Sequence, residues 1–165
     1  MISKKVLMAV FVACVFLIVG AVLLLPSDRQ GKNIVNYSSA AKEKPIVQTR
    51  ETLFDFGNVK VADVKEKDFE IKNVGSKTLD LFDITSSCGC TVGQVIYQGK
   101  TSRELGMHSQ NDDVFNIFPN TKAIIKVTYR PFIMPVYGVV AREVYVSTND
   151  PQTPKLVFQV KAYVE

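Results

Sequence analysis

The sequence has a single histidine and no tryptophan, and the shortage of histidine excludes several classes of enzyme. A Ser-His-Asp or Cys-His catalytic arrangement would have to use His108, and no serine of the chain lies in a nucleophile motif. The carboxylates are scattered without a marked acid–base pair, and the chain has no glycine-rich phosphate loop. We therefore expect that the chain is not an enzyme.

The larger part of the chain also lacks an excess of charge of either sign. The net charge of +4 arises within the first 47 residues, whereas from Gln48 onward 14 basic residues face 14 acidic ones. A nucleic-acid-binding domain usually carries a basic surface. We expect no nucleic-acid partner, and no motif points to a small-molecule substrate.

Cysteine is scarce as well, with three residues in the whole chain. Three cysteines cannot build a disulfide framework, so a packed core has to hold the domain together. Cys14 lies within an apolar run, where we expect it to act as a small apolar helix residue.

That apolar run is the longest in the chain and extends without a charge from Val6 to Leu25. Its 20 residues would form a helix about 30 Å long, which matches the hydrocarbon thickness of a bilayer. The preceding lysines favour a cytoplasmic tail at residues 1–5, although Arg29 and Lys32 partly oppose this orientation. We predict a single-pass transmembrane anchor with the body on the periplasmic or extracellular side.

Two other interpretations of the apolar run fit less well. A cleaved signal peptide needs a small-x-small exit site, and Val19-Gly20-Ala21 is a poor match that further apolar residues follow. A lipoprotein signal would place its cysteine at the end of the run, but eleven apolar residues follow Cys14. An uncleaved signal anchor therefore remains the favoured interpretation.

Residues 26–47 are polar and aperiodic, which predicts a flexible linker. Residues 48–165 instead alternate between apolar and polar side chains, as in Phe69 to Lys72 and Ile125 to Tyr129. We predict an all-β domain, an immunoglobulin-like seven-stranded sandwich, with a small closed barrel as the second choice. The expected strands are Leu53–Phe56, Lys67–Lys72, Leu79–Thr85, Val92–Tyr97, Ala123–Tyr129, Val139–Thr148 and Lys155–Tyr163. We expect the aromatic residues Phe54, Phe56, Phe69 and Tyr129 to belong to the core.

Two segments interrupt the alternation. Residues 98–118 are long and polar, which is typical of a solvated insertion and, less often, of a binding loop. Residues 131–135 form an apolar stretch bounded by two prolines. We expect a buried crossover at the sheet edge there, or alternatively an exposed edge that accepts a partner strand.

The triplet Cys88-Gly89-Cys90 is the one group of residues that could carry chemistry. A structural turn or a disulfide is the favoured interpretation, because glycine permits the tight turn that brings the two cysteines together. A metal site formed by Cys88 and Cys90 is the second possibility, with copper(I) as the ion that paired thiolates select. Met107, His108 and Met134 could then complete the ligand set. Thiol redox exchange is the third possibility.

Several short motifs occur together in a characteristic order. They are Phe54-Asp55-Phe56-Gly57-Asn58-Val59, Phe69-Glu70-Ile71-Lys72-Asn73-Val74-Gly75, Ser87-Cys88-Gly89-Cys90-Thr91, Val127-Thr128-Tyr129, Gly138 and Ser147-Thr148-Asn149-Asp150-Pro151. In order and spacing, the chain from about Leu53 to Val164 resembles the bacterial domain of unknown function 1573 (DUF1573), a relative of the hydin-type and major-sperm-protein-like immunoglobulin folds. The resemblance implies an exported β-sandwich without an established activity, whose eukaryotic relatives act mostly as interaction or scaffolding domains.

Together these features predict a membrane-anchored, extracytoplasmic module that binds or scaffolds an unidentified protein partner without enzymatic activity. The alternative is a protein that uses Cys88 and Cys90 to bind copper(I) or to exchange disulfides. No other cofactor is expected.

Overall fold

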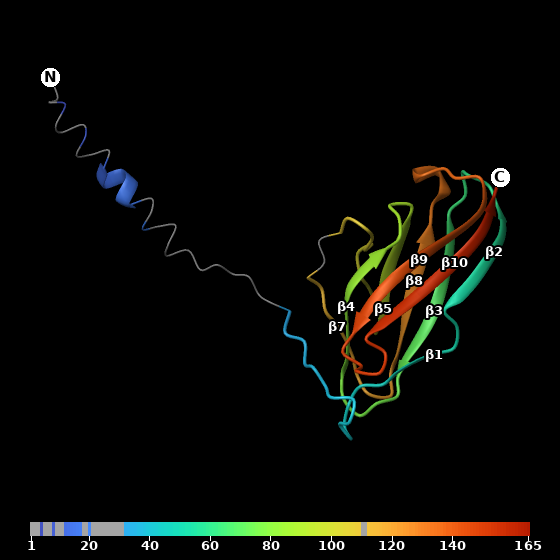
Figure 1. Ribbon diagram of the computed structural model, residues 1–165, viewed down its shortest axis with the longest axis horizontal. Coiled ribbons are helices and arrows are strands. Elements are labelled where there is room, and N and C mark those ends of the chain that lie inside the picture. Colours follow the sequence, from blue (N-terminus) through green and yellow to red (C-terminus); the bar gives the residue numbers. More distant parts are fainter. Residues whose placement is uncertain (1–3, 5–7, 9–11, 18–19, 21–31, 110–111) are drawn as a thin grey trace. The chain divides into compact units, whose positions relative to one another are not determined.

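The structure is a computed structural model that describes residues 4, 8, 12–17, 20, 32–109 and 112–165 (Figure 1). The chain divides into two compact units, Met1–Asn33 and Ile34–Glu165. Residues 12–17 of the first unit are helical. Within the described residues, no helix combines the length and apolarity needed to cross a membrane. Most of the predicted anchor between Val6 and Leu25 lies outside the described residues, as do most of the tail at 1–5 and residues 26–31 of the predicted linker.

The second unit is a sandwich of two five-stranded sheets. The first sheet has the order β1-β3-β8-β5-β6 and the second the order β2-β10-β9-β4-β7. Every neighbouring pair is antiparallel except β2 and β10, which run parallel. The strands are β1 (Val47–Thr49), β2 (Leu53–Val59), β3 (Lys65–Asn73), β4 (Leu79–Ser86), β5 (Thr91–Tyr97), β6 (Lys100–Thr101), β7 (Phe115–Ile117), β8 (Lys122–Tyr129), β9 (Gly138–Thr148) and β10 (Lys155–Val164).

The all-β prediction is confirmed, but the predicted number of seven strands is wrong. The seven expected strands correspond to β2, β3, β4, β5, β8, β9 and β10. The additional strands β1, β6 and β7 are two or three residues long and lie at the edges of the sheets. Such short strands contain too few residues to show alternation, because they form by pairing with a longer neighbour.

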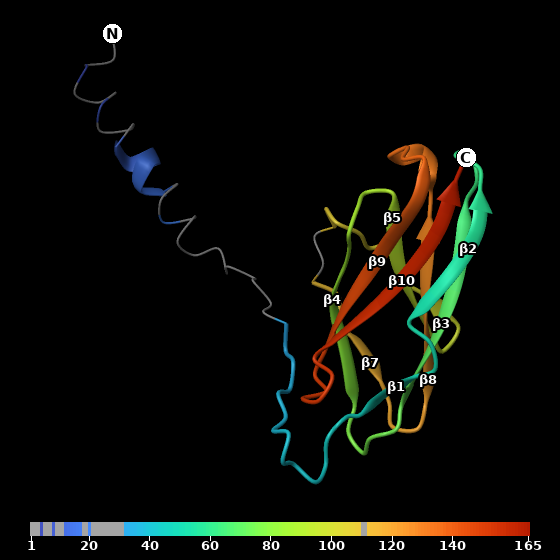
Figure 2. The same ribbon diagram turned by 45° about the vertical axis from the view of Figure 1, so that its right-hand side comes forward.

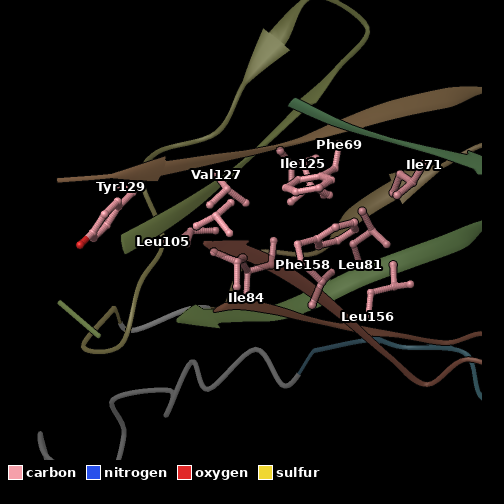
Figure 3. Close-up of a cluster of buried hydrophobic side chains, with 14 of the residues drawn as sticks. Phe69, Ile71, Leu81, Ile84, Leu105, Ile125, Val127, Tyr129, Leu156 and Phe158 are labelled. Carbon is pink, nitrogen blue, oxygen red and sulfur yellow. The ribbon is translucent and has the colours of Figure 1, made fainter. Parts of the chain in front are cut away.

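The core lies between the two sheets and follows the predicted alternation. Phe69 of β3 and Phe158 of β10 are fully buried, with ring centroids 5.0 Å apart across the sandwich (Figure 3). Tyr129 is buried, while Phe54 and Phe56 are partly buried against the same core. The expectation that these aromatic residues belong to the core is therefore confirmed.

The turns gather at two opposite ends of the sandwich (Figures 1 and 2). The network end consists of the turns 74–78, 118–121 and 149–154. The disulfide end consists of the turns 60–64, 87–90 and 130–137, together with the C-terminal residue.

Buried polar side chains tie the turns of the network end together. Asn149 accepts a hydrogen bond from the backbone N–H of Asp80 at 2.8 Å and donates to the Asp80 carboxylate at 2.9 Å. Asn73 donates to the carbonyls of Lys77 and Ile117 at 2.8 and 3.0 Å. Each contact joins two segments that are distant in sequence or closes a turn, so the network determines how this end is assembled.

The last residues of the predicted linker pack against the network end at Gly75. A Cβ at Gly75 would lie 2.3 Å from the carbonyl oxygen of Lys44 and 2.5 Å from the amide nitrogen of Ile46. The backbone of residues 44–46 therefore passes directly over Gly75, where it pairs with Val74 and Ser76. Only glycine permits so close an approach.

Within residues 98–109 and 112–118, the chain is more regular than the predicted solvated insertion. The segment contains β6 on the first sheet and β7 on the second, so it crosses between the sheets along one edge of the sandwich. Leu105 is fully buried and forms an isolated bridge with Gly93. Ile117 of β7 is fully buried as well, so Leu105 and Ile117 both fasten the segment to the core.

Candidate functional site

A disulfide joins Cys88 and Cys90 in the turn between β4 and β5. Their Cα atoms are 5.3 Å apart. Cys88 is 7% exposed and Cys90 is 1% exposed, and both pack with the hydrophobic core at the disulfide end. Of the three possibilities that the sequence leaves open for this triplet, the structure therefore contains a disulfide in a tight turn.

Hydroxyl groups on either side of the triplet hold the turn in place. The Ser86 hydroxyl donates to the Cys88 carbonyl at 2.8 Å and accepts from the Met107 backbone N–H at 3.1 Å. The Ser87 hydroxyl accepts from the backbone N–H of Glu143 at 3.0 Å. The motif Ser86-Ser87-Cys88 therefore fastens the turn both to β9 and to the long segment 98–118.

The hydroxyl of Thr91 points at the two sulfur atoms. Its Oγ1 lies 3.4 Å from the Cys88 Sγ and 3.9 Å from the Cys90 Sγ. A disulfide sulfur carries no proton, so the Thr91 hydroxyl is the donor in these contacts. Thr91 is fully buried, and this contact therefore lies in a region from which water is excluded.

Arg130 connects the turn to its surroundings on the other side. Its backbone N–H donates to the Cys90 carbonyl at 2.8 Å. Its guanidinium binds both carboxylate oxygens of Glu104, one of them at 2.9 Å. This bidentate pair raises the pKa of Arg130 and lowers the pKa of Glu104. The disulfide turn, the segment 98–118 and the end of β8 are thus linked together.

Two polar side chains point into the sandwich behind the disulfide. Tyr129 lies at the end of the row of core side chains, with its hydroxyl directed away from Phe69 and Phe158 (Figure 3). Arg142 lies on the core-facing side of β9 between the buried Val140 and Val144. Among the described residues, the Tyr129 hydroxyl and the Arg142 Nε are the buried side-chain polar atoms without a hydrogen-bond partner.

The positive charge of Arg142 acts on the Tyr129 hydroxyl. Burial raises the pKa of Tyr129, and the positive charge of Arg142 acts in the opposite direction. Sequence reasoning missed both roles, because Tyr129 was expected only as a core aromatic residue and Arg142 was not singled out. The signal that could have found Arg142 is a charge at an apolar position of an alternating strand.

The loop between β8 and β9 carries most of the exposed apolar side chains of this end. It starts with the 3₁₀ turn η1 (Pro131–Ile133) and continues to Tyr137. The prediction of a buried crossover at the sheet edge is therefore wrong, because most of the segment is exposed. The alternative prediction of an edge strand is also wrong, because the segment forms no strand. The segment is an exposed crossover between the two sheets. Its exposed apolar residues, with those of the adjoining strand ends, are Phe132, Ile133, Met134, Val136, Tyr137, Val139 and Tyr163.

The residues proposed to complete a metal site lie at different distances from the disulfide. The Met134 sulfur lies 3.9 Å from the position that a Cβ of Gly89 would occupy, so Met134 covers the turn. Met107 is bound to Ser86 through its backbone, and its side chain is exposed, as is His108. Within the described part of the chain, no group of three or more His, Cys, Asp or Glu residues is placed to hold a metal ion.

The fold is similar to that of several solved structures. A protein of unknown function from Porphyromonas gingivalis W83 aligns with a TM-score of 0.56 at 20% identity, over 73% of this chain and 47% of that protein. A family 123 glycoside hydrolase from Clostridium perfringens aligns with a TM-score of 0.52 at 10% identity, over 69% of this chain and 23% of the hydrolase. At these identities the likeness concerns the fold alone, and this chain spans about half or less of either protein.

A PapD-like domain of human CEP192 aligns with a TM-score of 0.47 at 16% identity, over 79% of this chain and 98% of that domain. None of the curated proteins matches the chain. Residues 47–103, from β1 to the start of the long segment, match the family model of a protein of unknown function, DUF1573, which confirms the resemblance recognised in the sequence.

Proposed function

We propose that the chain is a membrane-anchored, extracytoplasmic module that binds a protein partner through the β8–β9 loop and has no enzymatic activity of its own. The observation that carries this proposal is the group of exposed apolar side chains on that loop. Phe132 and Ile133 are each 47% exposed, and Tyr137 is 70% exposed. A contiguous exposed apolar surface on a folded domain commonly marks a site of association.

The loop is held in shape before a partner arrives. The backbone N–H groups of Ile133 and Met134 donate to the carbonyls of Arg130 and Pro131 at 3.2 and 3.1 Å. Pro131 and Pro135 restrict the backbone further. A surface that is already ordered loses little conformational entropy on binding, which favours affinity.

The chemistry of the loop suits a protein surface better than a small ligand. Its side chains project outward, and aromatic residues and methionine are enriched at protein interfaces. The sheet edges are less suited to pairing with a partner strand. The edge strands β1, β6 and β7 have two or three residues, and a register shift opposite Gly57 interrupts the pairing of β2 with β10.

The membrane anchor in this proposal rests on the sequence. The apolar run from Val6 to Leu25 has the length of a bilayer span, and Lys4 and Lys5 precede it. An anchored chain should remain with the membrane pellet after an alkaline wash, which releases peripheral proteins. Recovery of the full-length chain in the supernatant would contradict the anchor without affecting the proposed binding loop.

Site-specific crosslinking tests the binding loop. A photoreactive amino acid is placed at Phe132 or Tyr137 of the full-length chain, and Val157 on the outer face of the second sheet serves as the control position. We expect one reproducible protein adduct from the loop positions, lost when Ile133 is also changed to Ser, and no such adduct from position 157. Equal labelling from all three positions would contradict a binding site on this loop.

The alternative function uses Cys88 and Cys90 for copper(I) binding or for disulfide exchange. The exchange chemistry has structural features in its favour, and these do not depend on the β8–β9 loop as a binding surface.

A further inference from the structure

The disulfide contributes little to holding the domain together. It closes a loop of only three residues, and the entropy that a disulfide removes from the unfolded chain grows with the length of its loop. The apolar side chains between the two sheets extend through the whole sandwich and do not depend on this link. The disulfide can therefore open while the domain remains folded.

One group near the sulfur atoms favours the reduced, ionised state. The Thr91 hydroxyl is aimed at Cys88 Sγ from 3.4 Å and would donate to a thiolate formed there. The backbone N–H of Ser87 donates to the Glu143 carbonyl, and the Glu143 N–H donates to the Ser87 hydroxyl, so the turn is fastened to β9 next to Arg142. The Arg142 guanidinium itself donates to the Ala141 carbonyl at 3.0 Å and is half-buried. A hydrogen-bond donor stabilises a thiolate, whereas burial destabilises it, so Thr91 offsets part of the cost of ionising a buried thiol.

The two cysteines differ slightly in the exposure of the whole residue. Cys88 is 7% exposed and Cys90 is 1% exposed. Gly89 between them carries no side chain, and the flexible side chain of Met134 lies over it. Of the two cysteines, Cys88 is therefore the one that a thiol from solvent would reach first, once the Met134 side chain and the turn itself move aside.

From these observations we propose that Cys88 and Cys90 form a thiol–disulfide exchange site that accepts two electrons from a thiol of the glutathione class. In the first step the thiolate attacks Cys88 Sγ, the Cys88–Cys90 bond breaks, and a mixed disulfide forms while Cys90 leaves as a thiolate. A second thiolate then attacks the external sulfur of the mixed disulfide, which yields the oxidised thiol pair and releases Cys88. The two protons lost by the two thiols end on Cys88 and Cys90.

The geometry assigns separate roles to the two cysteines. Cys88 carries the mixed disulfide, and Cys90 is the leaving group and the thiolate that closes the bond again. The Thr91 hydroxyl reaches both sulfur atoms and so stabilises whichever thiolate is present. It acts as a positioning residue and does not itself form a bond with the substrate.

Equilibration in glutathione buffers tests the proposal. The full-length chain carrying Cys14→Ser is incubated at a series of reduced-to-oxidised glutathione ratios, quenched with acid, and alkylated. Mass spectrometry then counts the free thiols, and far-ultraviolet circular dichroism follows the fold in parallel samples. We expect conversion from disulfide to dithiol within this series, with an unchanged β-sheet spectrum.

Variants at Thr91 and at each cysteine sharpen the test. The quantity to compare is the ratio of the squared concentration of reduced glutathione to the concentration of oxidised glutathione at which half of the chains are reduced. Thr91→Val should raise this ratio roughly fivefold, as expected for the loss of one hydrogen bond. Thr91→Ser keeps the hydroxyl and should change the ratio by less than about twofold. Cys90→Ser should form a glutathione adduct at Cys88 faster than Cys88→Ser forms one at Cys90.

Two results would overturn the proposal. One is a pair that stays oxidised in every glutathione buffer in which the chain is folded. The other is a pair that opens only as the β-sheet spectrum is lost, which would make the disulfide a purely structural link. Neither result affects crosslinking from Phe132 or Tyr137, so the proposed binding loop is tested independently of the exchange site.

Discussion

The network end and the disulfide end of the sandwich both bury polar groups, but they use them differently. At the network end, Asp80 and Asn149 form two hydrogen bonds with each other, and Asn73 donates to the carbonyls of Lys77 and Ile117. At the disulfide end, the Tyr129 hydroxyl and the Arg142 Nε are buried without a partner among the described residues, and apolar side chains lie exposed nearby. Satisfied polar groups stabilise a fold, whereas unsatisfied groups and exposed apolar surface cost stability. The difference agrees with our proposals, in which the network end stabilises the fold and the disulfide end carries the binding loop and the exchange site.

The motifs that carry the family resemblance include some at the network end and one at the disulfide end. Asn73-Val74-Gly75 and Thr148-Asn149-Asp150 lie at the network end. There the carboxylate of Asp150 accepts from the backbone N–H of Val47 at 2.9 Å and Asn73 closes the turn that follows β3. These motifs therefore have a structural explanation. Ser87-Cys88-Gly89-Cys90-Thr91 lies at the other end, where its short disulfide adds little to stability.

The largest effect should come from breaking the network end. Asn149→Ala would leave the backbone N–H of Asp80 and one of its carboxylate oxygens without their partner in a buried site. We expect a loss of about 3 kcal/mol in the free energy of unfolding, since each buried group left unpaired costs about 1–3 kcal/mol. Urea unfolding followed by circular dichroism measures the change. Asn58→Ala, on an exposed part of β2, is the control and should change stability by less than about 0.5 kcal/mol.

Breaking the disulfide should have a smaller effect on stability. The double variant Cys88→Ser plus Cys90→Ser removes the closure of a three-residue loop, which corresponds to about 1–2 kcal/mol in the chain-entropy model. The same urea experiment measures the change. A loss larger than that of Asn149→Ala would reverse the comparison between the two ends.

The ion pair at the disulfide end should contribute less again and should depend on pH. Arg130 lowers the pKa of Glu104 below the ordinary 4.5, so the pair stabilises the fold above that pH. This contribution disappears as the pH falls through the lowered pKa of the folded state. Because both side chains are partly exposed, we expect Glu104→Gln to cost less than about 1 kcal/mol at pH 7.

Urea unfolding at pH 7 and at pH 3 separates the charge effect of Glu104→Gln from any packing effect. The difference between the variant and the original chain should shrink at the lower pH. Glu70→Gln, which breaks the more exposed pair with Lys122, is the matched control and should cost less at pH 7. A cost that stays constant with pH would assign the effect to packing.

The smallest effect on stability should come from the exposed loop. Phe132→Ser removes an apolar side chain that is 47% exposed, so unfolding should change by less than about 0.5 kcal/mol. Partner crosslinking from Tyr137 should nevertheless fall about tenfold or more if Phe132 is a central contact. A large loss of stability with unchanged crosslinking would show that the loop belongs to the fold.

The regular part of the fold was predictable because it depends on local alternation. Phe69 and Ile71 of β3, like Leu156 and Phe158 of β10, are buried as their two-residue period requires. The short edge strands β1, β6 and β7 were not predictable, since their pairing is decided by the neighbouring strands. Leu105 was missed because it is flanked by Glu104 and Gly106 in a part of the chain without two-residue alternation.

The candidate site was predictable only in part. The Cys88-Gly89-Cys90 triplet stood out by its spacing, which permits a tight turn but leaves the chemistry open. The approach of Thr91 and Met134 to the triplet depends on strand register and loop packing, which local sequence does not encode. The polar network was missed for a related reason, because asparagine at positions 73 and 149 is a residue type common in ordinary turns.

Reduction of the folded chain tests most directly the claim that the network end, and not the disulfide, stabilises the fold. The full-length chain would be unfolded in urea with and without an excess of a dithiol reductant. We predict that the reduced chain remains folded in the absence of urea, unfolds in one transition, and loses no more than about 2 kcal/mol. Collapse of the β-sheet spectrum on reduction alone would contradict this account, because the disulfide would then be required for the fold itself.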